Sequence, residues 1–280
     1  MGARIDWLDV NGVSLRYALE GTGDQAIVLL HEMGGSLETW DKVVPRLAGY
    51  RILRYDMRGA GLSQKVSSLT LDDLVADLGA VLDSLDIGGP VILAGVAVSA
   101  AVAAAFAARF PARVVSLVLM SLAAGIPPER REATAALARS IREGGLRARV
   151  DARLEATFPR RFRDDDRWVR DFRGRALGND PASYAAYYDM LLSLDLSKDL
   201  AAIRCPTLVL AGSDDGTRTP ERVAQDACAI PDMSFQTISS GHVMPVLTPA
   251  LVAEAIQAFS ALPACLPLDL SSSNGPRKVV

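Results

Sequence analysis

The segment around Ala97 combines a buried strand, a tight turn and the start of a helix in a pattern that is typical of a site for a nucleophile. In the motif G-x-S-x-G, small residues flank the serine because the chain turns so sharply that a larger neighbour would collide with the backbone. Gly95 and Ser99 keep the small flanking positions, but Ala97 stands where the motif has its serine. A methyl group cannot attack a carbonyl, so every functional expectation has to account for the missing hydroxyl.

Acid–base chemistry is indicated by a histidine and two aspartates near the ends of apolar runs. His242 follows one such run, and Asp214 and Asp215 follow another that ends at Gly212. A carboxylate that accepts a hydrogen bond from Nδ1 of a histidine fixes the tautomer of the ring and stabilises the imidazolium, which leaves Nε2 to act as a base. Either aspartate is a candidate partner for His242.

The elements that would position these residues alternate along the chain. Short apolar runs separated by helical patterns predict a parallel sheet that is covered by helices on both faces. The expected strands of this sheet are residues 26–31, 51–56, 90–96, 114–120, 206–212 and 234–239. Two further runs, 4–10 and 13–20, are joined by Asn11-Gly12, a strong hairpin signal that predicts an antiparallel edge.

Helical patterns fall between the expected strands. One helix should begin after the N-cap residue Thr70, and an alanine-rich helix over 99–110 should be buried against the sheet. From 123 to 196 the strand pattern stops and arginine-rich helical sequence takes over, which predicts a helical cap inserted into a core of residues 1–122 and 197–262. Fourteen arginines lie between residues 130 and 175. Most should lie on solvated helix faces, and the sharper alternative is that one or two hold a substrate carboxylate.

Bulk properties narrow the function classes. The chain has 280 residues, 50% of them hydrophobic, and a net charge of −3, so nucleic acid and anionic membranes are not expected partners. The N-terminus has no apolar signal-like segment and the longest apolar stretch is too short to span a bilayer, which predicts a cytoplasmic protein. The three cysteines lack metal-ligand spacing, so no metal is expected. Residues 263–280 lose periodicity and are expected to form a flexible tail.

Five short motifs follow one another along the chain. They are His31-Glu32-Met33-Gly34-Gly35-Ser36, Asp56-Met57-Arg58-Gly59-Ala60-Gly61-Leu62-Ser63, Gly95-Val96-Ala97-Val98-Ser99-Ala100, Gly212-Ser213-Asp214-Asp215 and Gly241-His242. In this order, the motifs make the chain resemble the α/β-hydrolase superfamily from about residue 13 to 259, and within it the 3-oxoadipate enol-lactonase-like group. The resemblance implies an α/β fold with an eight-stranded, mostly parallel sheet and a helical cap.

The resemblance also implies roles for individual residues. His242 would be the catalytic base and Ala97 the vacant nucleophile position, and the family spacing favours Asp215 over Asp214 as the orienting acid. The backbone N–H groups of Met33 and Val98 would form the oxyanion hole.

Two residues of the motif at 31–36, His31 and Glu32, are considered separately. His31 is expected to be a scaffold residue. Glu32 departs from the usual glycine, and it should either point away into a polar network or be neutral and serve as a replacement acid. No cofactor is implied, a small-molecule substrate is the expected partner, and a homodimer is common for such folds but is not decided by the sequence.

Three explanations of the missing serine remain open. The chain is an inactivated serine hydrolase, or an enzyme that uses a His-Asp base and an oxyanion hole without a covalent nucleophile, or a binding protein on a hydrolase scaffold. We favour the second explanation because Val96, Ser99 and Ala100 also depart from the usual elbow sequence, while the acid and the histidine are retained. Such an enzyme would act on a lactone, enol-lactone, ester or β-diketone, by hydrolysis or by lyase-type proton abstraction.

Overall fold

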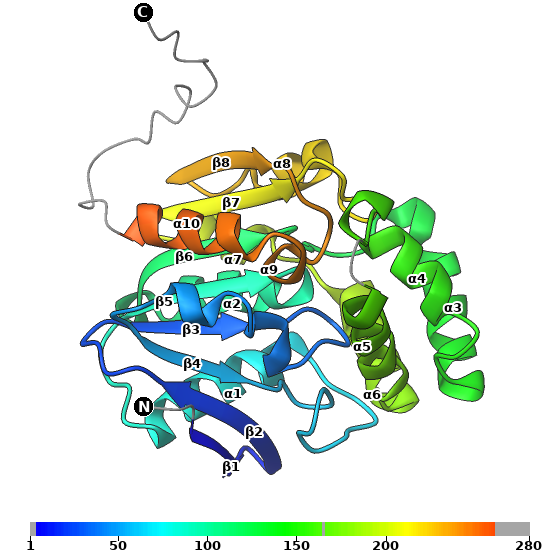
Figure 1. The fold of residues 1–280 in the computed structure, drawn as a ribbon, viewed down its shortest axis with the longest axis horizontal. Coiled ribbons are helices and arrows are strands. Elements are labelled where there is room, and N and C mark those ends of the chain that lie inside the picture. Colours follow the sequence, from blue (N-terminus) through cyan, green and yellow to red (C-terminus); the bar gives the residue numbers. More distant parts are fainter. Residues whose placement is uncertain (1–3, 164–165, 261–280) are drawn as a thin grey trace, which may run out of the picture.

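A computed structural model describes residues 4–163 and 166–260 of the chain, and its centre is an eight-stranded sheet with the order β1-β2-β4-β3-β5-β6-β7-β8 (Figure 1). The strands are β1 (Arg4–Val10), β2 (Val13–Glu20), β3 (Ala26–Leu30), β4 (Arg51–Tyr55), β5 (Val91–Val96), β6 (Val114–Met120), β7 (Thr207–Gly212) and β8 (Met233–Ile238). The expected strands are therefore confirmed to within one residue at each end. The predicted number of eight strands is likewise confirmed.

The sheet is parallel except at one edge. The strands from β4 to β8 pair in parallel, whereas β2 pairs antiparallel with both β1 and β4. The β1–β2 hairpin turns at Asn11 and Gly12, both of which have a positive φ, as the Asn-Gly pair predicts. Because parallel strands all end at the same edge, this arrangement brings the loops after β3, β5, β6, β7 and β8 together.

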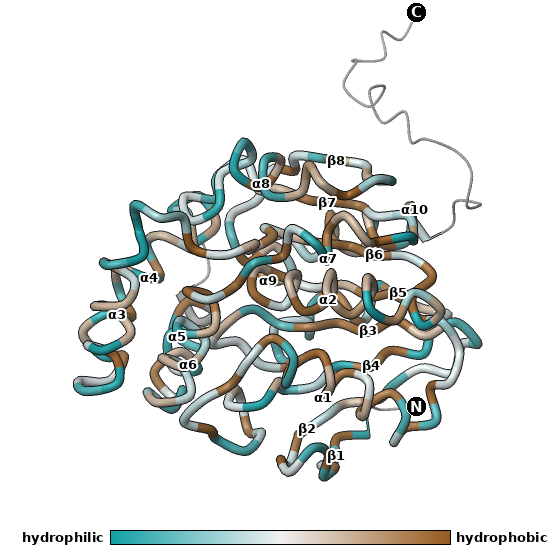
Figure 2. Tube along the Cα trace, turned by 180° about the vertical axis from the view of Figure 1, so that it is seen from behind, coloured by the Kyte–Doolittle hydropathy of each residue, from teal (hydrophilic) through white to brown (hydrophobic). Residues whose placement is uncertain are grey.

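Helices cover both faces of the sheet, and the alternation of side chains along each strand decides which helices they meet. In β5, Val91 and Leu93 pack with α1 (Leu71–Ser84) and α2 (Val98–Arg109), while Ile92 and Ala94 pack on the other face with α10 (Pro249–Ser260). Figure 1 shows α10 in front of the strands and Figure 2, from behind, shows α1 and α2 over hydrophobic central strands. The expected capping at Thr70 is present, since its hydroxyl accepts a hydrogen bond from the N–H of Asp73.

A helical segment lies between β6 and β7, beyond the carboxyl ends of the strands (Figure 1). We call residues 123–196 the cap segment. Its helices are α3 (Arg131–Gly144), α4 (Val150–Thr157), α5 (Asp166–Leu177) and α6 (Pro181–Ser193). The remaining helices are α7 (Ser197–Ala202), α8 (Pro220–Ala227) and α9 (Met244–Leu247).

Within the described residues, none of the helices has the length and apolar character that crossing a membrane requires. Cys205 and Cys228 are free thiols, and burial raises the pKa of the Cys205 thiol to about 11. The expected flexible tail, residues 263–280, and Cys265 within it lie outside the described residues.

Candidate active site

Ala97 forms the apex of a strained turn between β5 and α2. Its φ of 55° and ψ of −110° lie in a region that non-glycine residues rarely adopt, and its N–H donates to the carbonyl of Met120 at 2.8 Å. Ser99 supports the turn from inside: its Oγ accepts from the N–H of Val96 at 2.8 Å and lies 2.9 Å from the carbonyl oxygen of Leu30. The fully buried hydroxyl of Ser99 is thereby occupied in the scaffold, which disfavours it as a substitute nucleophile.

The structure brings His242 and Asp215 together. Nδ1 of His242 lies 2.8 Å from Oδ2 of Asp215, and both side chains are buried. Asp214, the alternative acid, is directed elsewhere: its carboxylate pairs with Arg161 of the cap segment. The imidazole of His242 is therefore held by Asp215 through Nδ1, the arrangement that leaves Nε2 free for chemistry.

The carboxylate of Asp215 is held ionised by four hydrogen-bond donors. Oδ1 accepts from the N–H groups of Thr217 and Arg218, each at 2.8 Å, and Oδ2 accepts from Ser121 Oγ at 2.8 Å in addition to His242. Burial opposes ionisation, but the attraction of His242 and these hydrogen bonds outweigh it, so the pKa of Asp215 lies below its usual value. An ionised Asp215 is the state that stabilises an imidazolium.

Two backbone N–H groups beside Ala97 are without partners. Within the part of the chain that the structure describes, the N–H groups of Met33 and Val98 donate to no backbone or side-chain acceptor. Val98 is the first residue of α2, where an N–H has no acceptor within the helix, and Met33 lies in the loop after β3. These are the positions at which such a fold places the donors of an oxyanion hole.

A divided cleft under the cap segment connects these groups. Its core-side cavity, of about 410 Å³, is lined by Glu32, Met33, Ala97, Val98 and His242, together with residues of the cap segment. Its cap-side cavity, of about 360 Å³, shares Met33 and His242 with the first. Ala97, His242, Met33 and Val98 therefore line one space that is large enough for a small molecule.

Comparison with known proteins identifies the family. Residues 27–255 match the family described as the alpha/beta hydrolase family. This chain belongs to the α/β-hydrolase family. The sequence resemblance is thereby confirmed at the level of the superfamily, and the enol-lactonase likeness is supported by the relatives below.

Two sequence relatives and one solved structure show how far the likeness of this α/β hydrolase extends. It is 29% identical over 260 residues to a Mycobacterium tuberculosis H37Rv protein that carries the name non-heme bromoperoxidase BpoC, covering 89% of this chain and 98% of that protein. It is 27% identical over 258 residues to 3-oxoadipate enol-lactonase 2 of Acinetobacter baylyi, covering 90% and 95% of the two chains. The enol-lactonase structure from Burkholderia xenovorans LB400 has a TM-score of 0.85 at 26% identity, covering 92% and 100%.

Glu32 lies beneath the loop that carries Met33 and is 1% exposed. Oε2 accepts from the hydroxyl of Thr39 at 3.0 Å, whereas Oε1 has no hydrogen-bond partner among the described residues. A Cβ on Gly35 would lie 2.5 Å from Oε1, so the glycine is required for the carboxylate to fit under the loop. The polar network that was one of the two expectations for Glu32 thus consists of a single side-chain hydrogen bond, to Thr39.

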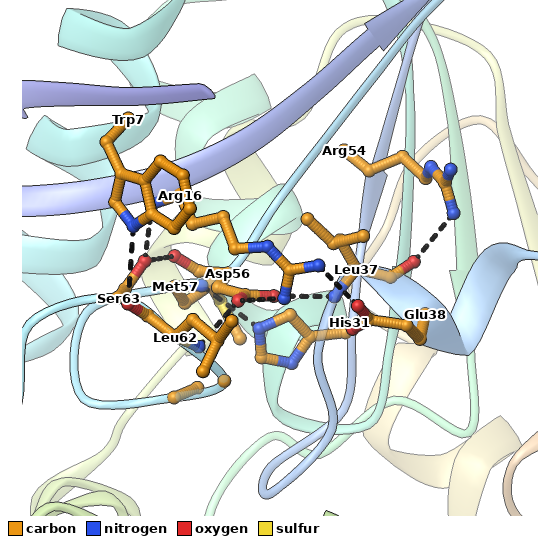
Figure 3. Close-up of polar contacts among 12 residues, drawn as sticks. Trp7, Arg16, His31, Leu37, Glu38, Arg54, Asp56, Met57, Leu62 and Ser63 are labelled. Atoms are coloured by element: carbon orange, nitrogen blue, oxygen red, sulfur yellow. Dashed lines mark hydrogen bonds and ion pairs between the residues drawn. The ribbon is translucent and has the colours of Figure 1, made fainter. Parts of the chain in front are cut away.

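His31 contacts the backbone of two loops through its ring nitrogens, as expected of a scaffold residue. Its Nε2 accepts from the N–H of Met57 at 3.0 Å, which leaves Nδ1 to donate to the carbonyl of Glu32 at 2.7 Å. Figure 3 shows His31 beside Met57 and, next to them, the buried Asp56, which accepts from the N–H of Leu37 at 2.6 Å. Both ring nitrogens of His31 are occupied, so neither is available to a substrate.

One residue that supports Asp215 and two residues that line the cleft were not identified from the sequence. Ser121 immediately follows β6, and β6 lies between β5 and β7 in the sheet, so its end falls between Ala97 and Asp215. The expected order of the strands in the sheet could have identified this serine as a neighbour of Ala97 and Asp215. Arg153 and Tyr188 of the cap segment line both cavities, and no local pattern distinguishes them from the other arginines and tyrosines of the segment. Within the described residues, no group of three or more His, Cys, Asp or Glu side chains is arranged to hold a metal ion.

Proposed function

We propose that this α/β hydrolase is an enzyme that acts on a small carbonyl compound, a lactone, enol-lactone, ester or β-diketone, without forming a covalent bond to its substrate. One observation carries the proposal: His242, held by the buried Asp215, lines the same cavity as the alanine at the nucleophile position. Met33 and Val98, whose N–H groups have no acceptor among the described residues, line that cavity too. A binding protein would have no need of an ionised acid aligned on a histidine. The names of the relatives support a carbonyl substrate.

The proposed reaction replaces the serine with water. The substrate carbonyl oxygen accepts hydrogen bonds from the N–H groups of Met33 and Val98, and a water molecule occupies the space beside the methyl group of Ala97. Nε2 of His242 takes a proton from this water as its oxygen attacks the carbonyl carbon, and Asp215 stabilises the imidazolium that forms. The tetrahedral intermediate then collapses, and His242 returns the proton to the leaving oxygen of an ester or lactone, or to the leaving carbon of a β-diketone, so that one water is consumed for each bond cleaved.

Catalysis without a covalent nucleophile can still give a substantial rate enhancement over water. An oxyanion hole and substrate binding alone supply a rate enhancement of about 10³- to 10⁴-fold over water after a catalytic triad is removed. General base catalysis by a positioned histidine contributes about 10²- to 10⁴-fold. The same base at the same position would also abstract a proton next to a carbonyl, which is the first step of the lyase alternative.

The test compares variants of the full chain on a panel of aryl esters, lactones and β-diketones. We expect measurable turnover by the unchanged protein, and a loss of about 10²- to 10⁴-fold in kcat/KM in both His242→Ala and Asp215→Asn. Asp214→Asn is the matched control, because that neighbouring aspartate pairs with Arg161 and not with the histidine. It should retain activity.

Ala97→Ser separates the remaining explanations. Turnover that appears only in the serine variant, with burst kinetics of an acyl-enzyme, would identify an inactivated serine hydrolase and contradict the proposal. Absence of turnover in both forms, together with ligand binding that does not depend on His242, would identify a binding protein.

A further inference from the structure

The cap-side cavity has an unusual balance of charge. Three arginines line it, Arg130, Arg149 and Arg153, and no aspartate or glutamate of the described residues does. The rest of its wall is largely apolar, with side chains such as Leu137 and Ile141. A cavity of this composition suits a molecule that has an apolar body and a negatively charged end.

Arg153 is the arginine best placed to bind such an end. It is half-buried, lies over the ring of Tyr184 with 5.1 Å between its Cζ and the ring centroid, and donates to the carbonyl of Met33. Among the described residues it makes no ion pair, whereas Arg142, Arg161, Arg163 and Arg173 of the same segment each pair with a carboxylate. Burial lowers the pKa of Arg153, and the attraction of Glu32, with which it forms no ion pair, offsets this only in part.

The two cavities differ in their acidic residues. The core-side cavity, next to Ala97, includes Glu32 and Glu129 in its wall, and these carboxylates would repel an anion. It also contains Arg218 and Arg222, but both pair with Asp226. Of the residues Asp, Glu, Lys and Arg, the cap-side cavity is lined by arginines only. Arg153 and His242 border both, so a ligand that spans them would direct its negative end toward the cap segment and its reacting carbonyl toward Ala97.

We propose that the cap-side cavity binds the anionic end of the substrate, a carboxylate on a short apolar chain, and that Arg153 is the residue that recognises it. This inference rests on the proposed function for the placement of the reacting carbonyl, but not for the binding of the anion. Arg130 contributes a second positive charge at the same wall, and the ring of Tyr184 holds the guanidinium of Arg153 in place.

The test is calorimetric titration of the full chain with hexanoate and with its neutral isostere hexanamide. We expect hexanoate to bind at least about 10-fold more tightly than hexanamide, since a charge-assisted hydrogen bond corresponds to about a 10- to 100-fold change in affinity. Arg153→Gln should remove that preference and leave the affinity for hexanamide unchanged. Arg153→Lys should keep part of it, because the charge remains and the planar fork is lost.

Arg139→Gln provides the matched control, because Arg139 is an exposed arginine of α3 that lines neither cavity, and it should bind both ligands as the unchanged protein does. Equal affinity for the two ligands in the unchanged protein, or a preference that survives in Arg153→Gln, would overturn the inference. A general loss of structure in Arg153→Gln would instead weaken hexanamide binding and lower the melting temperature, and Arg130→Gln would then test the anion preference without breaking the contact to Met33.

The binding assay also separates this inference from the proposed function. Hexanoate binding that depends on Arg153, in a protein without His242-dependent turnover, would support the anion site and contradict the enzyme. If turnover is found, Arg153→Gln should raise KM for a carboxylated ester by about 10-fold or more relative to its effect on KM for the uncharged ester.

Discussion

At the scale of single residues, Ser121 holds the acid of the candidate dyad. Its Oγ donates to Oδ2 of Asp215 at 2.8 Å, the same oxygen that contacts His242, and its own φ of 47° lies in the left-handed region. This strained conformation lies at the end of β6, and it directs the hydroxyl of Ser121 to the carboxylate of Asp215. We therefore regard Ser121 as a positioning residue that acts through Asp215.

Ser121→Ala should destabilise the protein by about 1.5–3 kcal/mol, the range for hydrogen bonds to charged groups. Because the folded-state pKa of Asp215 is lowered, its ionised form stabilises the fold above the unfolded-state pKa, and this stability is lost as pH falls through the folded-state pKa. The variant reduces the lowering, so acid unfolding should begin at a higher pH, and the acidic limb of any pH–rate profile should move the same way.

Circular dichroism during acid titration measures the first effect and initial rates measure the second. Ser116→Ala is the control, since Ser116 is also a buried serine of β6 but its hydroxyl has no hydrogen-bond partner among the described residues. If the two alanine variants shift the acid transition equally, Ser121 has no special role at Asp215.

At the scale of elements, the turn from β5 into α2 is built by close backbone approach. A Cβ added to Gly95 would lie 2.5 Å from the carbonyl oxygen and 2.7 Å from the carbonyl carbon of Ser99, which are backbone atoms that cannot move without displacing the helix. The architecture of a nucleophile-bearing turn is thus retained in full around an alanine.

Gly95→Ala should lower the free energy of unfolding by about 1–3 kcal/mol or more, the cost of forcing extra volume into a packed site. Gly88→Ala is the matched control, because an added Cβ there meets nothing within 4 Å, and it should change stability by less than about 0.5 kcal/mol. Urea unfolding gives the free energy of unfolding of both variants, provided that the m-value is unchanged. Equal midpoints for the two variants would show that the turn relaxes freely.

At the scale of the whole molecule, the cap segment is attached to the core through the same loop that carries Met33. Asn179 donates to the carbonyl of Gly34 at 3.0 Å, and Arg153 donates to that of Met33. Further away, the buried Tyr187 hydroxyl donates to the carbonyl of Arg58 at 2.9 Å. The cap segment and the loop that carries Met33 are therefore connected by hydrogen bonds.

Tyr187→Phe should destabilise the protein by about 1 kcal/mol, because it removes a buried hydrogen bond between the cap segment and the core. Tyr55→Phe serves as its control: that hydroxyl is also buried but has no partner among the described residues, so its removal should be neutral or slightly stabilising. Thermal unfolding followed by circular dichroism gives both values. A larger loss in Tyr55→Phe than in Tyr187→Phe would contradict the assigned contact.

Much of the architecture was predictable because it depends on local patterns. Apolar runs gave the strands to within one residue, Asn11-Gly12 gave the hairpin, and the capping threonine gave the start of α1. The superfamily followed from ordered motifs, each of which is short and tied to one strand end. The catalytic roles assigned to His242, Asp215, Met33 and Val98 remain predictions that the geometry supports.

The sequence by itself determined the strand–helix order, the turn at Ala97 and the loss of its hydroxyl, since periodicity and turn chemistry act between near neighbours. Only the tertiary structure showed that Asp215, which the family spacing favours, contacts His242 and that Ser121 supports this acid. It also showed that, among the cap arginines whose side chains are described, Arg153 is half-buried without an ion pair. The physical reason is that these outcomes depend on the directions of side chains from segments far apart in the chain, which are set when the strand ends and the cap segment pack together.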